Sequence, residues 1–144
     1  MSESILFVGK SRFLSLERRK KLRSVLKQKA EEFNFDVNWL QYVFVSDEAL
    51  LKLNQSALNH DTYTDIITFD LSDQEGVIEG EVYVSIDRVR DNAEKYNVTF
   101  EEEYIRVIGH GLLHLLGFKD KSEMEIAEMR KQENTIIGLY ADLK

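Results

Sequence analysis

The chain has 144 residues, of which 43% are hydrophobic and 31% charged, so it is long and apolar enough to fold as one domain and is not a disordered segment. Its net charge of −7 argues against broad, non-specific binding to nucleic acid. The absence of cysteine excludes disulfides and thiolate ligands, so any bound metal must be held by His, Asp or Glu.

Hydrophobic periodicity predicts the order of the helices and strands. Short runs rich in β-branched and aromatic residues are typical of strands, and apolar residues three and four apart behind a Ser or Thr cap are typical of helices. In chain order, the expected elements are a strand at 5–8, a helix at 15–33, a strand at 37–45, a helix beginning at 46, a loop at 54–64, a strand at 66–69, a turn at 73–79, a strand at 80–85 and helices at 86–96, 99–117 and 123–143. Strands and helices interleave without strict alternation and without an internal repeat, which predicts one α+β domain over residues 1–144.

Positive charge is concentrated in one of the predicted helices. Residues 10–32 hold nine basic and three acidic residues, a local charge of +6 that leaves −13 on the rest of the chain. A basic segment of this kind is typical either of a solvated helix face or of a local surface that contacts nucleic acid, and the sequence leaves both interpretations open.

The sequence shows neither a membrane anchor nor a secretory leader. Its apolar runs fall well short of the ~20 residues that cross a bilayer. The first residues carry an acid and no base ahead of a very short apolar run, which is unlike a secretory signal. We therefore expect a cytoplasmic location and no membrane partner.

Two of the three histidines lie four residues apart on the helix predicted at 99–117. That spacing places His110 and His114 one turn apart on one face, within reach of a single ion. Gly117 can adopt a left-handed conformation and end the helix, so the chain can turn back and bring the carboxylate of Asp120 to the same ion. The pattern matches the long zincin spacing with Asp as the third ligand, and two nitrogens and one oxygen leave the open position of a catalytic zinc site.

The pattern has two other interpretations. Histidines at helical spacing also occur as ordinary core or surface residues, and the glycine turn with its spaced carboxylate favours metal binding over that interpretation. A zincin peptidase carries Glu directly after the first His as its general base, and this chain has Gly111 there. Peptidase chemistry would therefore need a base from elsewhere in the chain.

The same segment resembles the signature of the YbeY family of bacterial metal-dependent endoribonucleases, His-Gly-x-Leu-His-Leu-x-Gly-Tyr-Asp-His. The positions in register are His110, Gly111, Leu113, His114, Leu115 and Gly117. Phe118 takes the place of the Tyr, Lys119 that of the Asp and Asp120 that of the third His ligand. Residues 64–69 and 80–85 are similar to two further segments of the family, its Thr-Asp-Val-Leu-Ser-Phe and Gly-Asp-Ile-x-Ile-Ser strands.

The resemblance implies an α+β fold with a small mixed β-sheet packed with helices and a metal-binding helix in a cleft. It implies one Zn²⁺ ion, held by His110, His114 and Asp120, and a single-strand endoribonuclease that acts in ribosomal RNA maturation and ribosome quality control. Single-stranded RNA, from ribosomal RNA or the ribosome, is then the expected partner. One departure is that the Arg which usually follows the family's Leu-Asn segment is Leu58 here.

Three further residues are candidates for roles around the metal. His60, in the predicted loop, is either an exposed polar residue or an imidazole that supplies a proton or contacts a phosphate in place of the missing Arg. Asp65 directly precedes a strand and is either a turn-capping residue or a catalytic carboxylate. Glu81 is either a carboxylate on the strand surface or a hydrogen-bond partner of a metal-bound His.

We therefore expect a hydrolase in which a metal-activated water attacks a phosphodiester bond of single-stranded RNA, with His60 and Asp65 as catalytic candidates. Two alternatives stay open, a peptidase-like zinc hydrolase and a non-catalytic ribosome-assembly protein with a structural metal. A carboxylate base placed at the metal would indicate the first, and a closed fourth ligand would indicate the second.

Overall fold

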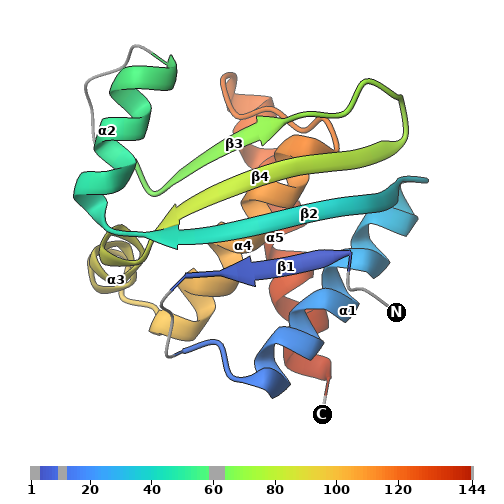
Figure 1. Cartoon of the computed structure of the whole chain (residues 1–144). Coiled ribbons are helices and arrows are strands. Elements are labelled where there is room, and N and C mark those ends of the chain that lie inside the picture. The colour runs from blue at the N-terminus through green and yellow to red at the C-terminus, as the bar shows by residue number, and fades with distance from the viewer. Residues whose placement is uncertain (1–3, 10–12, 59–63, 144) are drawn as a thin grey trace.

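Residues 4–9, 13–58 and 64–143 are described by the computed structural model, and within them four strands and five helices follow one another in the predicted order (Figure 1). In chain order they are β1 (Ile5–Val8), α1 (Leu16–Glu32), β2 (Asp36–Val45), α2 (Asp47–Leu58), β3 (Ile66–Asp70), β4 (Val77–Ser85), α3 (Ile86–Lys95), α4 (Phe100–Leu115) and α5 (Glu123–Asp142). Each helix starts behind a hydroxyl side chain that accepts a hydrogen bond from the backbone N–H three residues on, namely Ser15, Ser46, Ser85, Thr99 and Ser122. None of the helices in this described part of the chain has the length and apolarity of a membrane span.

Two boundaries differ from the sequence-based expectation by three residues or more. The expected loop at 54–64 is wrong over residues 54–58, because α2 continues to Leu58 and Asn54 is buried, at 4% exposure. Residues 59–63 of that loop lie outside the described part of the chain. Packing of that helix face outweighs the weak helix propensity of Asn and Ser. The expected turn at 73–79 is too long, because β4 begins at Val77, which pairs with Asp36 of β2. Both differences come from partners distant in the sequence.

The strands form one mixed sheet in the order β1-β2-β4-β3. β1, β2 and β4 run parallel to one another, while β3 is antiparallel to β4. In Figure 1, helices α1, α4 and α5 lie behind the sheet and cover one of its faces, whereas α2 and α3 follow directly on β2 and β4. The predicted α+β fold, with a small mixed sheet packed against helices, is confirmed.

Helix α4 carries the predicted ligands and packs closely against the sheet. Ile108 and Leu112 are fully buried, and the hydroxyl of Tyr42 on β2 donates a hydrogen bond of 2.8 Å to the carbonyl of Ile108. A Cβ atom at Gly111 would lie 2.8 Å from the side chain of Val82 on β4, so the lack of a side chain lets the α4 backbone approach the sheet. These contacts fix the orientation of the helix face on which the histidines lie.

Candidate metal centre

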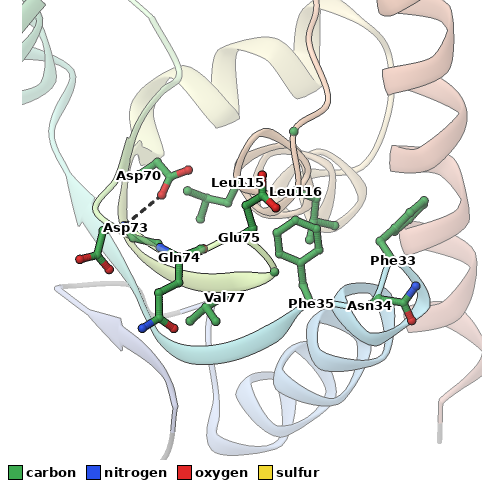
Figure 2. Close-up of a pocket in the computed structure, with 13 residues that line it drawn as sticks. Phe33, Asn34, Phe35, Asp70, Asp73, Gln74, Glu75, Val77, Leu115 and Leu116 are labelled. Carbon is green, nitrogen blue, oxygen red and sulfur yellow. Dashed lines mark hydrogen bonds between the residues drawn. The ribbon is translucent and has the colours of Figure 1, made fainter.

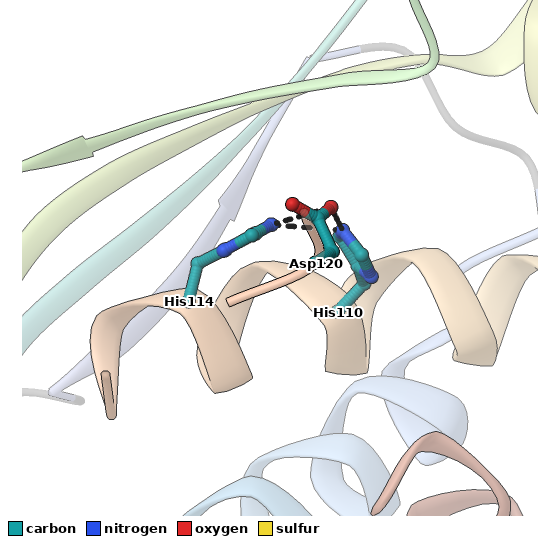
Figure 3. A group of neighbouring side chains, drawn as sticks. All are labelled: His110, His114 and Asp120. Atoms are coloured by element: carbon teal, nitrogen blue, oxygen red, sulfur yellow. Dashed lines mark hydrogen bonds and ion pairs between the residues drawn. The ribbon is translucent and has the colours of Figure 1, made fainter. Parts of the chain in front are cut away.

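His110 and His114 lie one turn apart on α4 and direct their imidazoles toward the same point (Figure 3). Their Nε2 atoms are 2.9 Å apart, and the two rings meet edge to face with their centroids separated by 4.5 Å. Both side chains are only partly buried. The helical spacing therefore produces the paired nitrogen donors that the sequence predicts.

The third predicted ligand reaches this point through the turn at the end of α4. Gly117 has a φ of +101°, and the N–H of Phe118 donates a hydrogen bond of 3.0 Å to the carbonyl of Leu113, which is the pattern of a left-handed helix cap. The Oδ2 atom of Asp120 lies 3.4 Å from the Nε2 atom of each histidine. The structure thus brings the three residues together, with one donor atom from each within 4.8 Å of the others.

Two of the three distances between these donors match those around a tetrahedral ion, whereas the Nε2 pair, at 2.9 Å, is closer together. A tetrahedral ion with bonds of about 2.0–2.2 Å separates its ligand atoms by about 3.4 Å, the distance from Asp120 to either imidazole. The Nδ1 atom of His110 lies 2.6 Å from Oε2 of Glu133, and that of His114 lies 3.1 Å from the carbonyl oxygen of Phe118. Because a carboxylate and a carbonyl only accept, each Nδ1–H is the donor, and each Nε2 is the atom that would bind a proton or a metal ion.

Glu133 on α5 is the site residue that the sequence analysis missed. Its side chain is 6% exposed, and its Oε1 atom lies 3.2 Å from Arg106 Nη1 and 3.4 Å from Arg130 Nη1. These ion pairs stabilise a buried negative charge beside His110. The sequence held one signal for it, an acid within the buried stripe of α5, which runs through Met129, Gln132, Glu133, Ile136 and Tyr140.

The charges around the two imidazoles shift their pKa values in opposite directions. Burial lowers the pKa of His110, but the hydrogen bond and charge of Glu133, together with the charges of Asp65 and Asp120, raise it above its usual value. Burial and the positive charge of His110 lower the pKa of His114, and Asp120 opposes them only in part. A metal therefore competes with a proton mainly at His110.

Glu81, considered above as a partner of a metal-bound histidine, lies on the other face of the sheet. Side chains of β4 alternate between two faces, and Val82 is the residue that contacts Gly111 of α4. The carboxylate of Glu81 instead accepts a hydrogen bond of 3.3 Å from the hydroxyl of Tyr83.

The space beside Gly111 is closed, since a Cβ atom there would lie 2.8 Å from Val82 and 3.1 Å from Ile66. Position 111 cannot hold a peptidase base.

A cavity of about 250 Å³ lies beside the imidazole of His110. Its wall includes Asp65, whose carboxylate accepts a hydrogen bond of 3.3 Å from Asn92 of α3. Burial raises the pKa of Asp65, although the charge of His110 opposes this shift. The structure therefore brings one of the two catalytic candidates to the metal centre. The other, His60, lies outside the described residues.

A larger cavity, of about 740 Å³, lies beyond the carboxyl-terminal end of α4 (Figure 2). Leu115 and Leu116 line it together with the carboxylates of Asp70, Asp73 and Glu75. Among its described lining residues none is basic, so this cavity is unsuited to a polyanionic ligand. The cavity beside His110 is the better candidate for such a ligand, because arginines and the three metal donors border it or lie next to it.

The chain is similar to known proteins over most of its length. The family model described as endoribonuclease YbeY matches residues 9–141. A protein named endoribonuclease YbeY from Cytophaga hutchinsonii is 44% identical over 137 residues, which cover 95% of this chain and 96% of that protein. A protein of the same name from Flavobacterium johnsoniae is 48% identical over 101 residues, which cover 70% of this chain and 72% of that protein. The solution structure of TM1509 from Thermotoga maritima matches with a TM-score of 0.68 at 28% identity, covering 94% of this chain and 88% of that one.

Proposed function

The chain belongs to the endoribonuclease YbeY family and is a metal-dependent endoribonuclease, and we propose that His110, His114 and Asp120 hold one zinc ion for the cleavage of single-stranded RNA. The observation that carries the proposal is the convergence of these three donor atoms within 4.8 Å of one another. Two nitrogens and one oxygen are typical of catalytic zinc and leave one coordination position for water or substrate.

Bound at this site, a divalent ion supplies an activated water and neutralises charge on the phosphoryl oxygens. The carboxylate of Glu133 holds the Nδ1–H of His110, which keeps Nε2 of that ring directed at the ion. We propose Asp65 as the proton acceptor, because it lies on the wall of the same cavity and its raised pKa makes it a stronger base than an exposed Asp. His60 is proposed as a further contact to a phosphate.

The family assignment gives this enzyme a role in ribosomal RNA processing. We propose ribosomal RNA, alone or within the ribosome, as the substrate, and the cytoplasm as the location. The peptidase alternative is disfavoured because Val82 and Ile66 occupy the space beside Gly111 in which a zincin base would lie.

Cleavage of a labelled single-stranded RNA by the purified protein, with metal content measured on the same sample, tests the proposal. We expect about one zinc per chain and cleavage that stops with a chelator and returns with added zinc. His114→Ala should abolish both zinc retention and cleavage, because it removes one of the paired nitrogens.

Three results would contradict this proposal in different ways. RNA cleavage that is insensitive to the chelator would come from a contaminant. Zinc binding without RNA cleavage by the wild type would favour the ribosome-assembly alternative. Zinc-dependent cleavage of casein would favour the peptidase alternative.

A further inference from the structure

The cavity beside His110 has more acidic than basic side chains in its wall. The carboxylates that line it are Asp65, Glu103, Asp120 and Glu133. Such a wall repels the backbone of a nucleic acid, so an RNA that reaches the metal centre needs positive charge there in addition to the ion. The two arginines that line the same cavity, Arg106 and Arg130, are the candidates.

The two arginines differ in their exposure and in how many side-chain oxygens they contact. The side chain of Arg106 is 14% exposed, and its guanidinium lies within 3.7 Å of several carboxylate or amide oxygens, those of Glu102, Glu103, Glu133 and Asn134. Arg106 is therefore held in the wall as the counterion of these acids. The side chain of Arg130 is 56% exposed, and its Nη1 atom lies 3.4 Å from Oε1 of Glu133.

The contact between Arg130 and Glu133 leaves the guanidinium available. Glu133 already has Arg106 at 3.2 Å on one oxygen and His110 at 2.6 Å on the other. The side chain of Arg130 is mostly in water, so its contact with the buried Glu133 is screened and holds the guanidinium only weakly. A guanidinium also has five N–H donors, more than one shared oxygen can accept. Arg130 can therefore bind an anion that enters the cavity.

We propose that Arg130 forms a subsite for a backbone phosphate of the RNA beside the metal centre, an inference that rests on the proposed RNA substrate. A planar guanidinium matches two oxygens of one phosphate. Arg130 and His110 contact opposite oxygens of Glu133, so the guanidinium is separated from Nε2 of His110 by a carboxylate and an imidazole ring. This separation assigns Arg130 to a phosphate that neighbours the cleaved one, where it contributes to binding and not to the chemical step.

The test compares Arg130→Ala with Lys131→Ala in the zinc-loaded protein. Lys131 is the next residue on α5, is exposed, and is not one of the residues that line the cavity. We expect Arg130→Ala to raise KM for a single-stranded RNA about tenfold with kcat nearly unchanged, as for a contact made equally before and during the reaction. Lys131→Ala should leave both constants nearly unchanged. Arg130→Lys, which keeps the charge without the planar fork, should recover part of the loss.

Binding gives a second readout that does not depend on turnover. With chelator present, anisotropy of a labelled single-stranded RNA at several salt concentrations should give a slope of log K against log salt that is smaller in magnitude by about 0.7 for Arg130→Ala. Zinc affinity, measured by chelator competition, and the melting temperature should match the wild type, because Arg106 keeps Glu133 paired.

Equal KM values and equal salt slopes for Arg130→Ala and Lys131→Ala would overturn the subsite while leaving the proposed function intact. Weaker zinc binding, or a fall in kcat at unchanged KM, would also overturn it, because Arg130 would then act on the metal centre through Glu133. Absence of RNA cleavage by the wild type is a separate result that removes the proposed function, and the subsite with it.

Discussion

Glu133 accepts a hydrogen bond of 2.6 Å from the Nδ1–H of His110, a residue 23 positions earlier in the chain. A carboxylate on the far side of a ligand imidazole fixes the tautomer, so that the lone pair is on Nε2, and makes that nitrogen more basic. The carboxylate is itself buried and paired with Arg106 at 3.2 Å. Helix α5 therefore shapes the metal centre, although the candidate ligands come from α4 and the turn that follows it.

Replacing Glu133 by Gln tests this relationship. Glu133→Gln keeps the size of the side chain but removes the charge beside His110, so we expect zinc affinity to fall by about 10- to 100-fold. Chelator competition measures the affinity. The control is Glu128→Gln, because Glu128 also lies on α5 but accepts its hydrogen bond from Gln132. If both variants bind zinc as the wild type does, Glu133 has no influence on the metal.

Two glycines on different helices should respond to alanine with opposite signs. Gly111→Ala places a Cβ atom 2.8 Å from Val82 and 3.1 Å from Ile66, so we expect it to lower the free energy of unfolding by about 1–3 kcal/mol. Gly138→Ala meets nothing within 4 Å on α5 and should raise it by about 0.5–1 kcal/mol, because Ala loses less backbone entropy in a helix. Urea unfolding of the metal-free protein measures both. An unchanged stability for Gly111→Ala would show that α4 can move away from the sheet.

Asp120 is the candidate ligand in which this chain departs from the family signature. Its Oδ2 atom lies 3.4 Å from both imidazoles, so Asp120→Ala should lower zinc affinity. Asp120→His supplies a nitrogen donor from the same turn and should keep or raise that affinity. Chelator competition on the two variants decides the matter. Equal zinc affinities for the wild type and Asp120→Ala would remove Asp120 from the ligand set.

The partly buried carboxyl of Asp65 should make the metal-free protein less stable at neutral pH. Burial raises the pKa of Asp65 above its ordinary value of 3.8, so the folded state favours the protonated form. The contribution of Asp65 to stability is therefore greatest below about pH 4 and is lost as the pH rises through the folded pKa. Asp65→Asn, which stays neutral, should be more stable than the wild type at pH 7, and this gain should shrink as the pH falls.

Urea unfolding in the presence of chelator, at pH 7 and at pH values stepping down toward 4, measures the effect of Asp65→Asn. The control is Asp91→Asn, because Asp91 is exposed on α3 and its ionised form stays in water. A gain for Asp65→Asn that does not change with pH would show that the charge of Asp65 is not its cause. The same variant should cleave RNA more slowly if Asp65 accepts a proton in the reaction.

The sequence by itself determined the order of the elements and the three candidate ligands. Hydroxyl caps and hydrophobic periodicity are local signals, and they mark where the helices begin. The three candidate ligands are also close together in the sequence, because His110 and His114 lie one turn apart on α4 and Asp120 follows the turn at Gly117. The fold of a segment this short depends mainly on its own residues, so its geometry could be predicted.

Only the tertiary structure decided what surrounds these ligands. Packing of α5 against α4 brings Glu133 to His110, and packing of α4 against β4 places Val82 beside Gly111, which leaves Glu81 on the other face of the sheet. The continuation of α2 past Asn54 depends in the same way on burial against other elements. Each of these contacts joins segments far apart in the chain, and no local pattern specifies which distant side chain will satisfy a buried donor or fill the space beside a glycine.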